Sequence, residues 1–212
     1  MTPDTEEQPT LVPPLVQWRA ATRPYGGEDV SGDLEVVACY PGGALAAVID
    51  GLGHGPKAAL AARAAAAVLR RQPGETVTDL MTLCHEALRQ TRGAVISLAS
   101  FNAASATVTW VGVGNVAGVL LRRAPLPLPA SETLLSRAGV VGYRLPRLRA
   151  ACLSVRCGDL VVLATDGIKG DFNRGLTVDR SIEDIATGIL REHGRITDDA
   201  LVLVVLCSGM PP

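Results

Sequence analysis

Four aspartates of this sequence each stand at the boundary of a short apolar run. Asp33 precedes LEVVACY and Asp198 lies just before ALVLVVL, whereas Asp50 follows ALAAVI and Asp166 follows LVVLAT. Antiparallel neighbours place the start of one strand beside the end of the next, so we expect the four carboxylates to meet at one rim of a sheet or sandwich. Clustered carboxylates repel one another, and a cation is the usual compensation. Oxygen ligands without Cys or His favour Mg²⁺ or Mn²⁺ over Zn²⁺.

The segment after Asp50 strengthens this interpretation. It runs Gly51-Leu52-Gly53-His54-Gly55 and enters an Ala-rich helix. Glycines let the backbone approach an ion or a phosphate closely, and a helix N-terminus favours an anion. Each feature alone also has a structural explanation, because strand-end aspartates form turns and a glycine-rich loop can be a tight strand-to-helix connection. The chemical interpretation therefore depends on their combination.

Short apolar runs bounded by Gly, Pro, Asn or Asp predict the strands that must position these residues. The predicted strands are 17–22, 34–40, 44–49, 94–101, 107–113, 116–122, 149–155, 160–165 and 201–207. Helices are predicted at 56–71, 78–91 and 181–192, the last with a capping box in SIED. Pro125–Glu132 is interpreted as a connection. Strand runs interrupted by two adjacent helices indicate an α+β fold with a mainly antiparallel sheet.

Composition limits the class of protein. The chain has 212 residues, 48% apolar and 19% charged, which suits one folded domain and not a disordered chain. We expect a flexible tail over 1–14, without the features of a signal peptide, and a single domain over 15–208. A net charge of −1 and 3% aromatic residues argue against nucleic-acid binding. Five scattered cysteines without a CxxC pair predict reduced thiols and a cytoplasmic protein.

An uncharged stretch from Gly93 to Leu121 is long enough for a membrane span. Its Ser and Thr residues recur in alternation, and Gly114 and Asn115 indicate a turn. Two or three half-buried strands explain it better than a helix in lipid, so no membrane association is expected.

Four motifs occur together in one order: VSGD (30–33), IDGLGHG (49–55), ATDG (164–167) and TDDALVLVV (197–205). Over about Val16 to Cys207 they resemble the metal-dependent PPM serine/threonine phosphatases, in particular the SpoIIE-like bacterial branch. The sequence of the IDGLGHG motif is most similar to that of the RsbX-like subgroup, whose members are short, stand-alone stressosome phosphatases. The resemblance implies a four-layer α-β-β-α sandwich of two mainly antiparallel sheets flanked by helices.

The resemblance also implies a site with two divalent cations, Mn²⁺ or Mg²⁺. Asp50 would bridge the ions and the carbonyl of Gly51 would complete one site, with Asp33 in the shell of the second ion. Asp166 and Asp198 would serve the first. Secondary candidates are Asp199 and Glu28. Two such ions can hold and activate a water for in-line attack on phosphorus, so no covalent intermediate is needed.

Groups that bind the phosphate or protonate the leaving oxygen are less defined. His54 is a candidate general acid because histidine titrates near neutrality. In eukaryotic relatives the histidine directly follows Asp-Gly, whereas here it comes two residues later, so helix capping or phosphate orientation are equally open roles. Arg19 or Arg23 could bind the phosphate. A basic run that could meet an acidic partner, or form a solvated loop, consists of Arg144, Arg147 and Arg149.

The expected partners are phosphorylated STAS-domain proteins of the stressosome, and the chain is expected to be monomeric. One alternative is a phosphatase of an anti-anti-sigma factor. Another is a non-catalytic binding module with a phosphatase fold. The four mutually repelling carboxylates argue against that last alternative, because a pseudoenzyme has no need to keep them.

Overall fold

The computed structural model describes residues 14–26, 28–124 and 129–210. Strands and helices in these residues follow the order β1 (Val16–Arg23), β2 (Asp33–Tyr40), β3 (Gly43–Gly51), α1 (Gly55–Arg71), α2 (Val77–Leu88), β4 (Ala94–Asn102), β5 (Thr107–Val113), β6 (Ala117–Leu121), β7 (Ser131–Leu134), β8 (Ala151–Ser154), β9 (Leu160–Ala164), α3 (Ile182–His193) and β10 (Ala200–Cys207).

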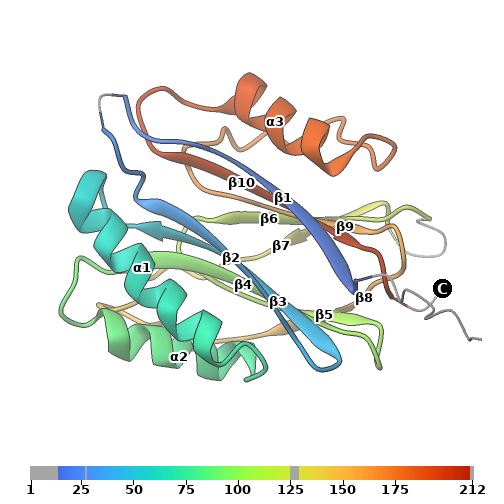
Figure 1. Cartoon of the computed structure of the whole chain (residues 1–212), viewed down its shortest axis with the longest axis horizontal. Helices are drawn as coiled ribbons and strands as arrows, with labels where there is room; N and C mark the ends of the chain where they lie inside the picture. Colours follow the sequence, from blue (N-terminus) through green and yellow to red (C-terminus); the bar gives the residue numbers. More distant parts are fainter. Residues whose placement is uncertain (1–13, 27, 125–128, 211–212) are drawn as a thin grey trace, which may run out of the picture.

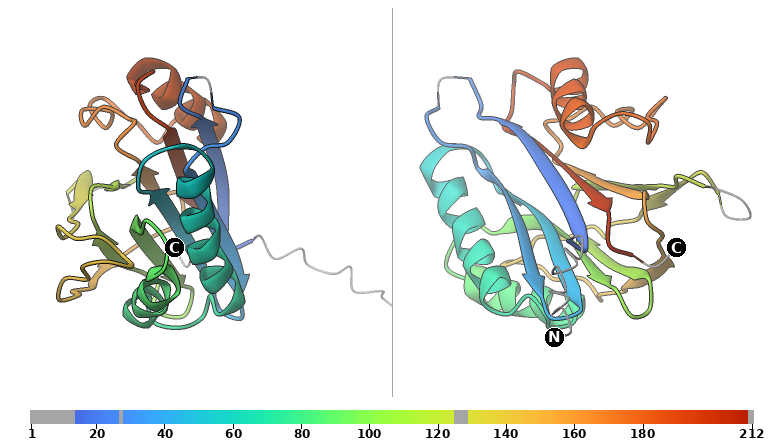
Figure 2. Two further views of the ribbon diagram at one scale, coloured as in Figure 1. Left: turned by 90° about the vertical axis from the view of Figure 1, so that its left-hand side faces the viewer. Right: turned by 45° about the vertical axis from the view of Figure 1, so that its right-hand side comes forward.

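The strands form two antiparallel sheets that pack face to face. Sheet A has the order β1-β10-β9-β6-β7, and sheet B the order β2-β3-β4-β5-β8. Helix α3 covers the outer face of sheet A, and α1 and α2 cover sheet B (Figures 1 and 2). Three apolar clusters fill the spaces between the four layers. The predicted α+β, four-layer sandwich is confirmed.

Alternation along β3 shows how the sequence directs side chains into different layers. Ala46 and Val48 lie in the core between the sheets, whereas Ala47 and Ile49 pack toward α1 and α2. Because the side-chain period of a strand is two, Asp50 continues the inter-sheet row at the point where the apolar core ends. Both faces of β3 are therefore buried, and the carboxylate of Asp50 lies at the rim between the sheets.

Helix α1 can pack closely on sheet B because its buried face consists largely of alanine. A Cβ placed on Gly51 would be 2.2 Å from the carbonyl oxygen of Ala58. Only glycine therefore fits at this position, and the Asp50-Gly51 segment is held directly beneath the first turns of the helix.

The predicted strands and helices are all present, with ends that differ by at most three residues. Strand β7 was not predicted, because Ser131 and Glu132 directly follow a Pro-rich segment and were interpreted as a connection. The strand is a short edge strand of four residues that pairs with β6. Residues 125–128 of the predicted connection, and residues 1–13 of the predicted tail, lie outside the described residues.

The uncharged stretch from Gly93 to Leu121 forms β4, β5 and β6, as its alternating polar residues predicted. Among the described residues, no helix has the length and apolar character needed to cross a membrane.

Candidate active site

Sheet B brings two of the four aspartates side by side. Asp33, the first residue of β2, is the direct cross-strand partner of Asp50 near the end of β3. Directly opposed residues in an antiparallel pair have their Cβ atoms about 5 Å apart on one face, where like charges destabilise the pair. The antiparallel pairing of β2 and β3 therefore places these two carboxylates against each other, at a common rim as their strand-end positions predicted.

Sheet A supplies the other two from neighbouring antiparallel strands. Asp166 follows β9, Asp198 precedes β10, and the strands pair at Ala164 and Val202. The two turns touch, because a Cβ on Gly167 would lie only 1.9 Å from the carbonyl oxygen of Asp199. Glycine after Asp166 is thus a packing requirement that keeps the ATDG and TDD segments together.

Thr165 joins the two sheets at this rim. Its buried hydroxyl donates a hydrogen bond of 2.8 Å to Oδ2 of Asp33 and accepts one of 2.9 Å from the backbone N–H of Leu201. The hydroxyl thereby orients a sheet B carboxylate from sheet A. Sequence reasoning missed Thr165, although its position directly before Asp166 in the ATDG motif was a usable signal.

A cavity of about 420 Å³ opens where the strand ends meet. Its lining consists of Asp50, Leu52, Gly53, Val95, Gly114, Asn115, Ala138, Gly139, Asp166 and Asp198. Asp33 is not among these residues; it is 6% exposed and lines a separate, smaller cavity of about 100 Å³. Asn115, which the sequence indicated only as a turn residue, donates a hydrogen bond of 2.7 Å to Oδ2 of Asp166. Its amide therefore fixes one carboxylate of the lining.

Burial and mutual repulsion raise the pKa values of three carboxylates in the cluster. Burial raises the pKa of Asp50 to about 9, with further contributions from Asp33 and Asp166. Burial also raises the pKa of Asp33 to about 7, although the hydrogen bond from Thr165 opposes the increase. The pKa of Asp198 is raised by burial and by Asp166. Ionising the group at neutral pH therefore needs a compensating positive charge.

A divalent cation fits this donor set, because the clustered groups offer only oxygen atoms. Asp50 accepts no side-chain or loop hydrogen bond from the described residues, so its partly buried carboxylate is left without compensation. Within the described ranges, no three His, Cys, Asp or Glu side chains already stand close enough to surround one ion. Backbone carbonyls or water would therefore have to complete any coordination shell.

Asp199 has a different environment from Asp198. Its Oδ1 accepts a hydrogen bond from the backbone N–H of Tyr25 and its Oδ2 one from that of Gly32, both at 2.8 Å. The side chain is buried. Both oxygens thus hold the connection between β1 and β2 against the start of β10, which makes Asp199 an anchor for the segment that leads into Asp33.

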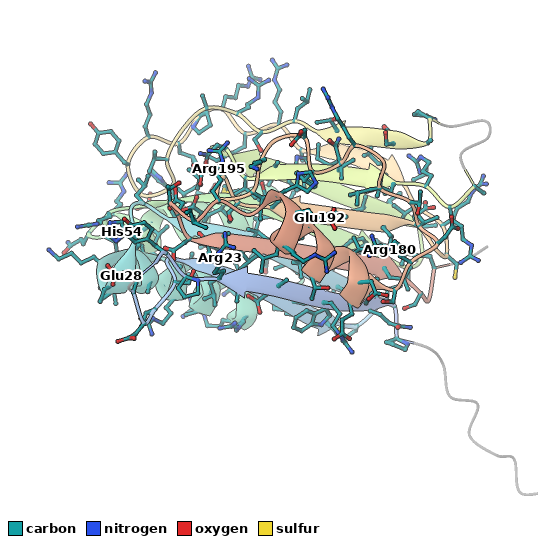
Figure 3. All side chains as sticks on the ribbon, turned by 90° about the horizontal axis from the view of Figure 1, so that it is seen from above. Arg23, Glu28, His54, Arg180, Glu192 and Arg195 are labelled. Carbon is teal, nitrogen blue, oxygen red and sulfur yellow. The ribbon has the colours of Figure 1, made fainter. Side chains whose placement is uncertain are left out.

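His54 is held by two residues of the same connection. Its Nδ1 lies 3.0 Å from Oε1 of Glu28, and its ring centroid lies 4.7 Å from that of Tyr25. Figure 3 shows His54 and Glu28 together at one end of the molecule. His54 is the N-cap residue of α1, but its side chain makes no capping hydrogen bond, which contradicts the helix-capping alternative. Glu28 contacts the imidazole, and not the aspartate cluster.

The arginines suggested for phosphate binding are directed elsewhere. Arg19 pairs with Glu183 of α3 at 3.8 Å. Nη2 of Arg23 donates to the carbonyl oxygen of Arg195 at 2.6 Å, and Figure 3 labels both of these arginines. Neither Arg19 nor Arg23 lines the cavity. Arg92 was not predicted, yet its Nη1 lies 2.8 Å from the position a Cβ would take on Gly53. The only signal for it in the sequence was its position just before β4.

A turn between α2 and β4 holds Arg92 beside the cavity. The hydroxyl of Thr91 accepts a hydrogen bond from the backbone N–H of Gly93, and the carbonyl of Gly93 accepts one from Leu52. Arg92 itself is exposed and forms no ion pair with the described residues. A free guanidinium thus lies at the edge of a cavity lined by carboxylates.

Comparison with known proteins identifies the family. The family model of stage II sporulation protein E (SpoIIE) matches residues 40–207, which include three of the four motifs in full. This chain belongs to the SpoIIE family. It is therefore a serine/threonine phosphatase of the metal-dependent PPM class, as its motifs predicted.

Individual relatives agree in sequence and in structure. The chain is 25% identical over 166 residues to phosphoserine phosphatase RsbX of Bacillus subtilis (strain 168), covering 77% of this chain and 80% of RsbX. It superposes on a crystal structure of RsbX in complex with magnesium with a TM-score of 0.81 and 23% identity, over 91% and 96% of the two chains. A chain from a structural study of the bacterial stressosome gives a TM-score of 0.80 and 30% identity, over 90% and 98%.

The raised pKa values of Asp33 and Asp50 predict how stability depends on pH in the metal-free protein. The folded state keeps protons that the unfolded chain releases near pH 4, so the free energy of unfolding should fall as pH rises from about 4 toward about 9. Urea unfolding in EDTA at a series of pH values measures this slope. Added Mn²⁺ or Mg²⁺ should raise the melting temperature most at the alkaline end, where the carboxylates are free to bind it.

Asp50→Asn provides the control for this experiment, because it removes one titrating carboxyl and its repulsion of Asp33. The variant should show a flatter slope in EDTA and a smaller gain from the cation. Identical pH profiles for the variant and the wild type would show that Asp50 does not titrate as the geometry requires.

Proposed function

We propose that this chain, through a single domain over residues 15–208, removes phosphate from phosphoserine or phosphothreonine in STAS-domain proteins of the stressosome. The observation that carries the proposal is the convergence of Asp50, Asp166 and Asp198 on one cavity, with Asp33 paired to Asp50 across β2 and β3. A phosphomonoester is a dianion that these carboxylates would repel, unless cations lie between them. The similarity to phosphoserine phosphatase RsbX and to a stressosome chain supports the choice of substrate.

Two divalent cations, Mn²⁺ or Mg²⁺, fit the proposed arrangement. Asp50 would contact both, the Gly51 carbonyl and Asp33 would each serve one ion, and Asp166 and Asp198 would complete the protein ligands. When bound, the ions would supply an activated water as the nucleophile and neutralise charge on the phosphate. The contribution of the chain itself is rigidity, because Thr165 orients Asp33 and Asn115 orients Asp166.

His54 is proposed as the group that protonates the leaving oxygen. Glu28 accepts a hydrogen bond from Nδ1 of the imidazole at 3.0 Å, which orients the ring and leaves Nε2 free to face the leaving oxygen. The ring of Tyr25 limits rotation of the imidazole. His54 directly follows Gly53 of the cavity lining, which places the ring beside the cavity.

Arg92 is proposed as the phosphate-binding arginine. Its guanidinium lies against Gly53 in the cavity lining and has no acidic partner among the described side chains. A planar guanidinium can donate two parallel hydrogen bonds to phosphate oxygens, which fixes the orientation of the ester as well as its position.

The central test is hydrolysis of a phosphorylated STAS-domain protein by the purified chain and by Asp50→Asn. Activity should require Mn²⁺ or Mg²⁺, disappear in EDTA, and fall by orders of magnitude in the variant, because the shared ligand of the cations is weakened. Release of inorganic phosphate measures the rate. A folded and fully active Asp50→Asn would contradict the assigned role of Asp50.

The same assay separates the alternatives. Faster hydrolysis of a phosphorylated anti-anti-sigma factor than of the stressosome protein would favour that substrate instead. Tight binding of either phosphoprotein without any release of phosphate would favour a non-catalytic binding module.

The role of His54 can be tested by comparing two leaving groups. His54→Ala should reduce phosphoserine hydrolysis by about a hundredfold or more, because an alkoxide needs a proton as it departs. Hydrolysis of p-nitrophenyl phosphate should change much less, since nitrophenolate leaves without one. Glu28→Gln should give a smaller loss and shift the acid–base profile. His193→Ala, at the end of α3 and beside Asp171, serves as the control because His193 does not line the cavity. An unchanged pH–rate profile in His54→Ala would eliminate the general-acid role.

Arg92→Ala should raise the KM for a phosphoserine substrate by about tenfold, in line with the loss of a charge-assisted hydrogen bond. Arg92→Lys should restore part of the affinity, because the charge remains without the bidentate geometry. Arg89→Ala is the control, since Arg89 lies at the same end of α2 and pairs with Glu86. Equal effects of the Arg89 and Arg92 substitutions would assign the change to general charge, and not to phosphate contact.

A further inference from the structure

A segment of the chain next to the cavity is basic and contains no acidic residue. Between Glu132 and Asp159 the sequence has five arginines and neither Asp nor Glu, although the whole chain has a net charge of −1. The arginines are Arg137, Arg144, Arg147, Arg149 and Arg156. None of them forms an ion pair with the described residues. Their charge is therefore available to a partner.

The backbone of this segment is well fixed. The N–H of Arg137 donates to the carbonyl of Gly112 at 3.0 Å, and its carbonyl accepts from Gly114 at 2.8 Å. Further along, Val141 and Ala94 exchange two hydrogen bonds, at 2.8 and 3.0 Å. Leu145 and Leu148 pack against the core beneath α1 and α2. A solvated, unstructured loop would have none of these attachments, so the segment presents its arginines from a rigid base.

Two of the arginines line a groove that adjoins the catalytic cavity. The groove has a volume of about 680 Å³ and contains Arg137 and Arg149 together with apolar side chains. Its apolar side chains include Leu135, 81% exposed, and Pro146. Ala138 lines both the groove and the cavity that contains Asp50. A polypeptide with its phosphate in the cavity can therefore continue into the groove.

We infer that this groove binds an acidic segment of the phosphoprotein substrate next to its phosphorylated residue. The inference rests on the proposed phosphatase function. Two guanidinium groups that share one groove repel each other, and a carboxylate between them relieves the repulsion and accepts paired hydrogen bonds. Exposed Leu135 offers apolar contact for the stem of a Glu side chain or for a neighbouring aliphatic residue.

The arrangement also gives the substrate a direction. The carboxylates of the cavity repel an acidic peptide except where cations are bound, whereas the groove attracts it. The phosphate is thus directed to the aspartate cluster and the acidic flank to the arginines. A peptide with a basic flank would meet like charge in the groove and be disfavoured.

Phosphoserine peptides that differ only in one flank, with Glu, Ala or Lys residues, test this inference on the full chain with Mn²⁺. The wild type should hydrolyse the Glu-flanked peptide with a kcat/KM about tenfold above the Lys-flanked one, mainly through KM, and the preference should shrink at high salt. Arg137→Glu/Arg149→Glu should abolish or reverse the preference, and Arg137→Gln/Arg149→Gln should reduce it. Each rate is divided by that for p-nitrophenyl phosphate, so that general loss of activity cancels.

Arg70→Glu/Arg71→Glu is the matched control, with the same change in net charge at the opposite end of α1 from the cavity. It should keep the wild-type preference. No preference in the wild type, or the same loss in the control, would overturn the inference. Binding to vesicles that contain phosphatidylserine, without discrimination among the peptides, would assign the arginines to a lipid surface instead.

Binding of the peptides to Asp50→Asn, followed by fluorescence anisotropy, separates failure of the groove from failure of the proposed function. Preferential binding of the Glu-flanked peptide without hydrolysis by the wild type would support the groove and contradict the phosphatase proposal. Hydrolysis without any preference in rate or binding would support the phosphatase proposal and contradict the role of the groove.

Discussion

The repulsion among carboxylates held at one rim is the interaction on which the rest of the site depends. Asp33 and Asp50 oppose each other across β2 and β3, and two more aspartates approach from sheet A. Burial removes the water that would screen them, so the pKa of Asp50 rises to about 9. A fold built for stability alone would replace such a cluster with apolar residues. Its presence makes the rim a place where positive charge must be supplied from outside the chain.

The surrounding structure holds the carboxylates in place against this repulsion. Thr165 ties Asp33 of sheet B to β10 of sheet A, and Asp199 holds the backbone of Gly32 beside it. Glycines at 51 and 167 allow backbone-to-backbone contacts that any side chain would block. These attachments come from segments far apart in the sequence, so the site exists only when the two sheets are packed together. Asp33 and Asp166 are therefore oriented before a cation binds, which leaves less ordering to oppose binding.

Much of this could be predicted from the sequence, because strand ends and alternation are local signals. The order of the predicted strands and helices followed from apolar runs, and the four-layer sandwich from the resemblance that the four motifs carry. The convergence of the aspartates on one rim followed from their positions at strand ends, whereas the register that pairs Asp33 with Asp50 did not. The roles of Asn115 and Arg92 did not, because both depend on which turns pack together, at distances of 51 residues to Asp166 and 39 to Gly53 along the chain. Strand β7 was missed for a different reason: an exposed four-residue edge strand has too few apolar positions to show a period.

The distribution of charge links the chemistry to recognition. A net charge of −1 suggests a neutral protein, yet acids gather at the strand ends while a stretch of 26 residues beside them has arginines and no acid. Each region alone would be unfavourable for the protein, since the aspartates repel anionic substrates and the arginines repel one another. Because the aspartate-lined cavity and the arginine-lined groove meet at Ala138, different parts of one anionic substrate can contact each of them. The phosphate can approach only where cations offset the aspartates, and acidic residues nearby are drawn to the arginines. Specificity of this kind needs no deep pocket, because separated charges are enough to position an extended substrate.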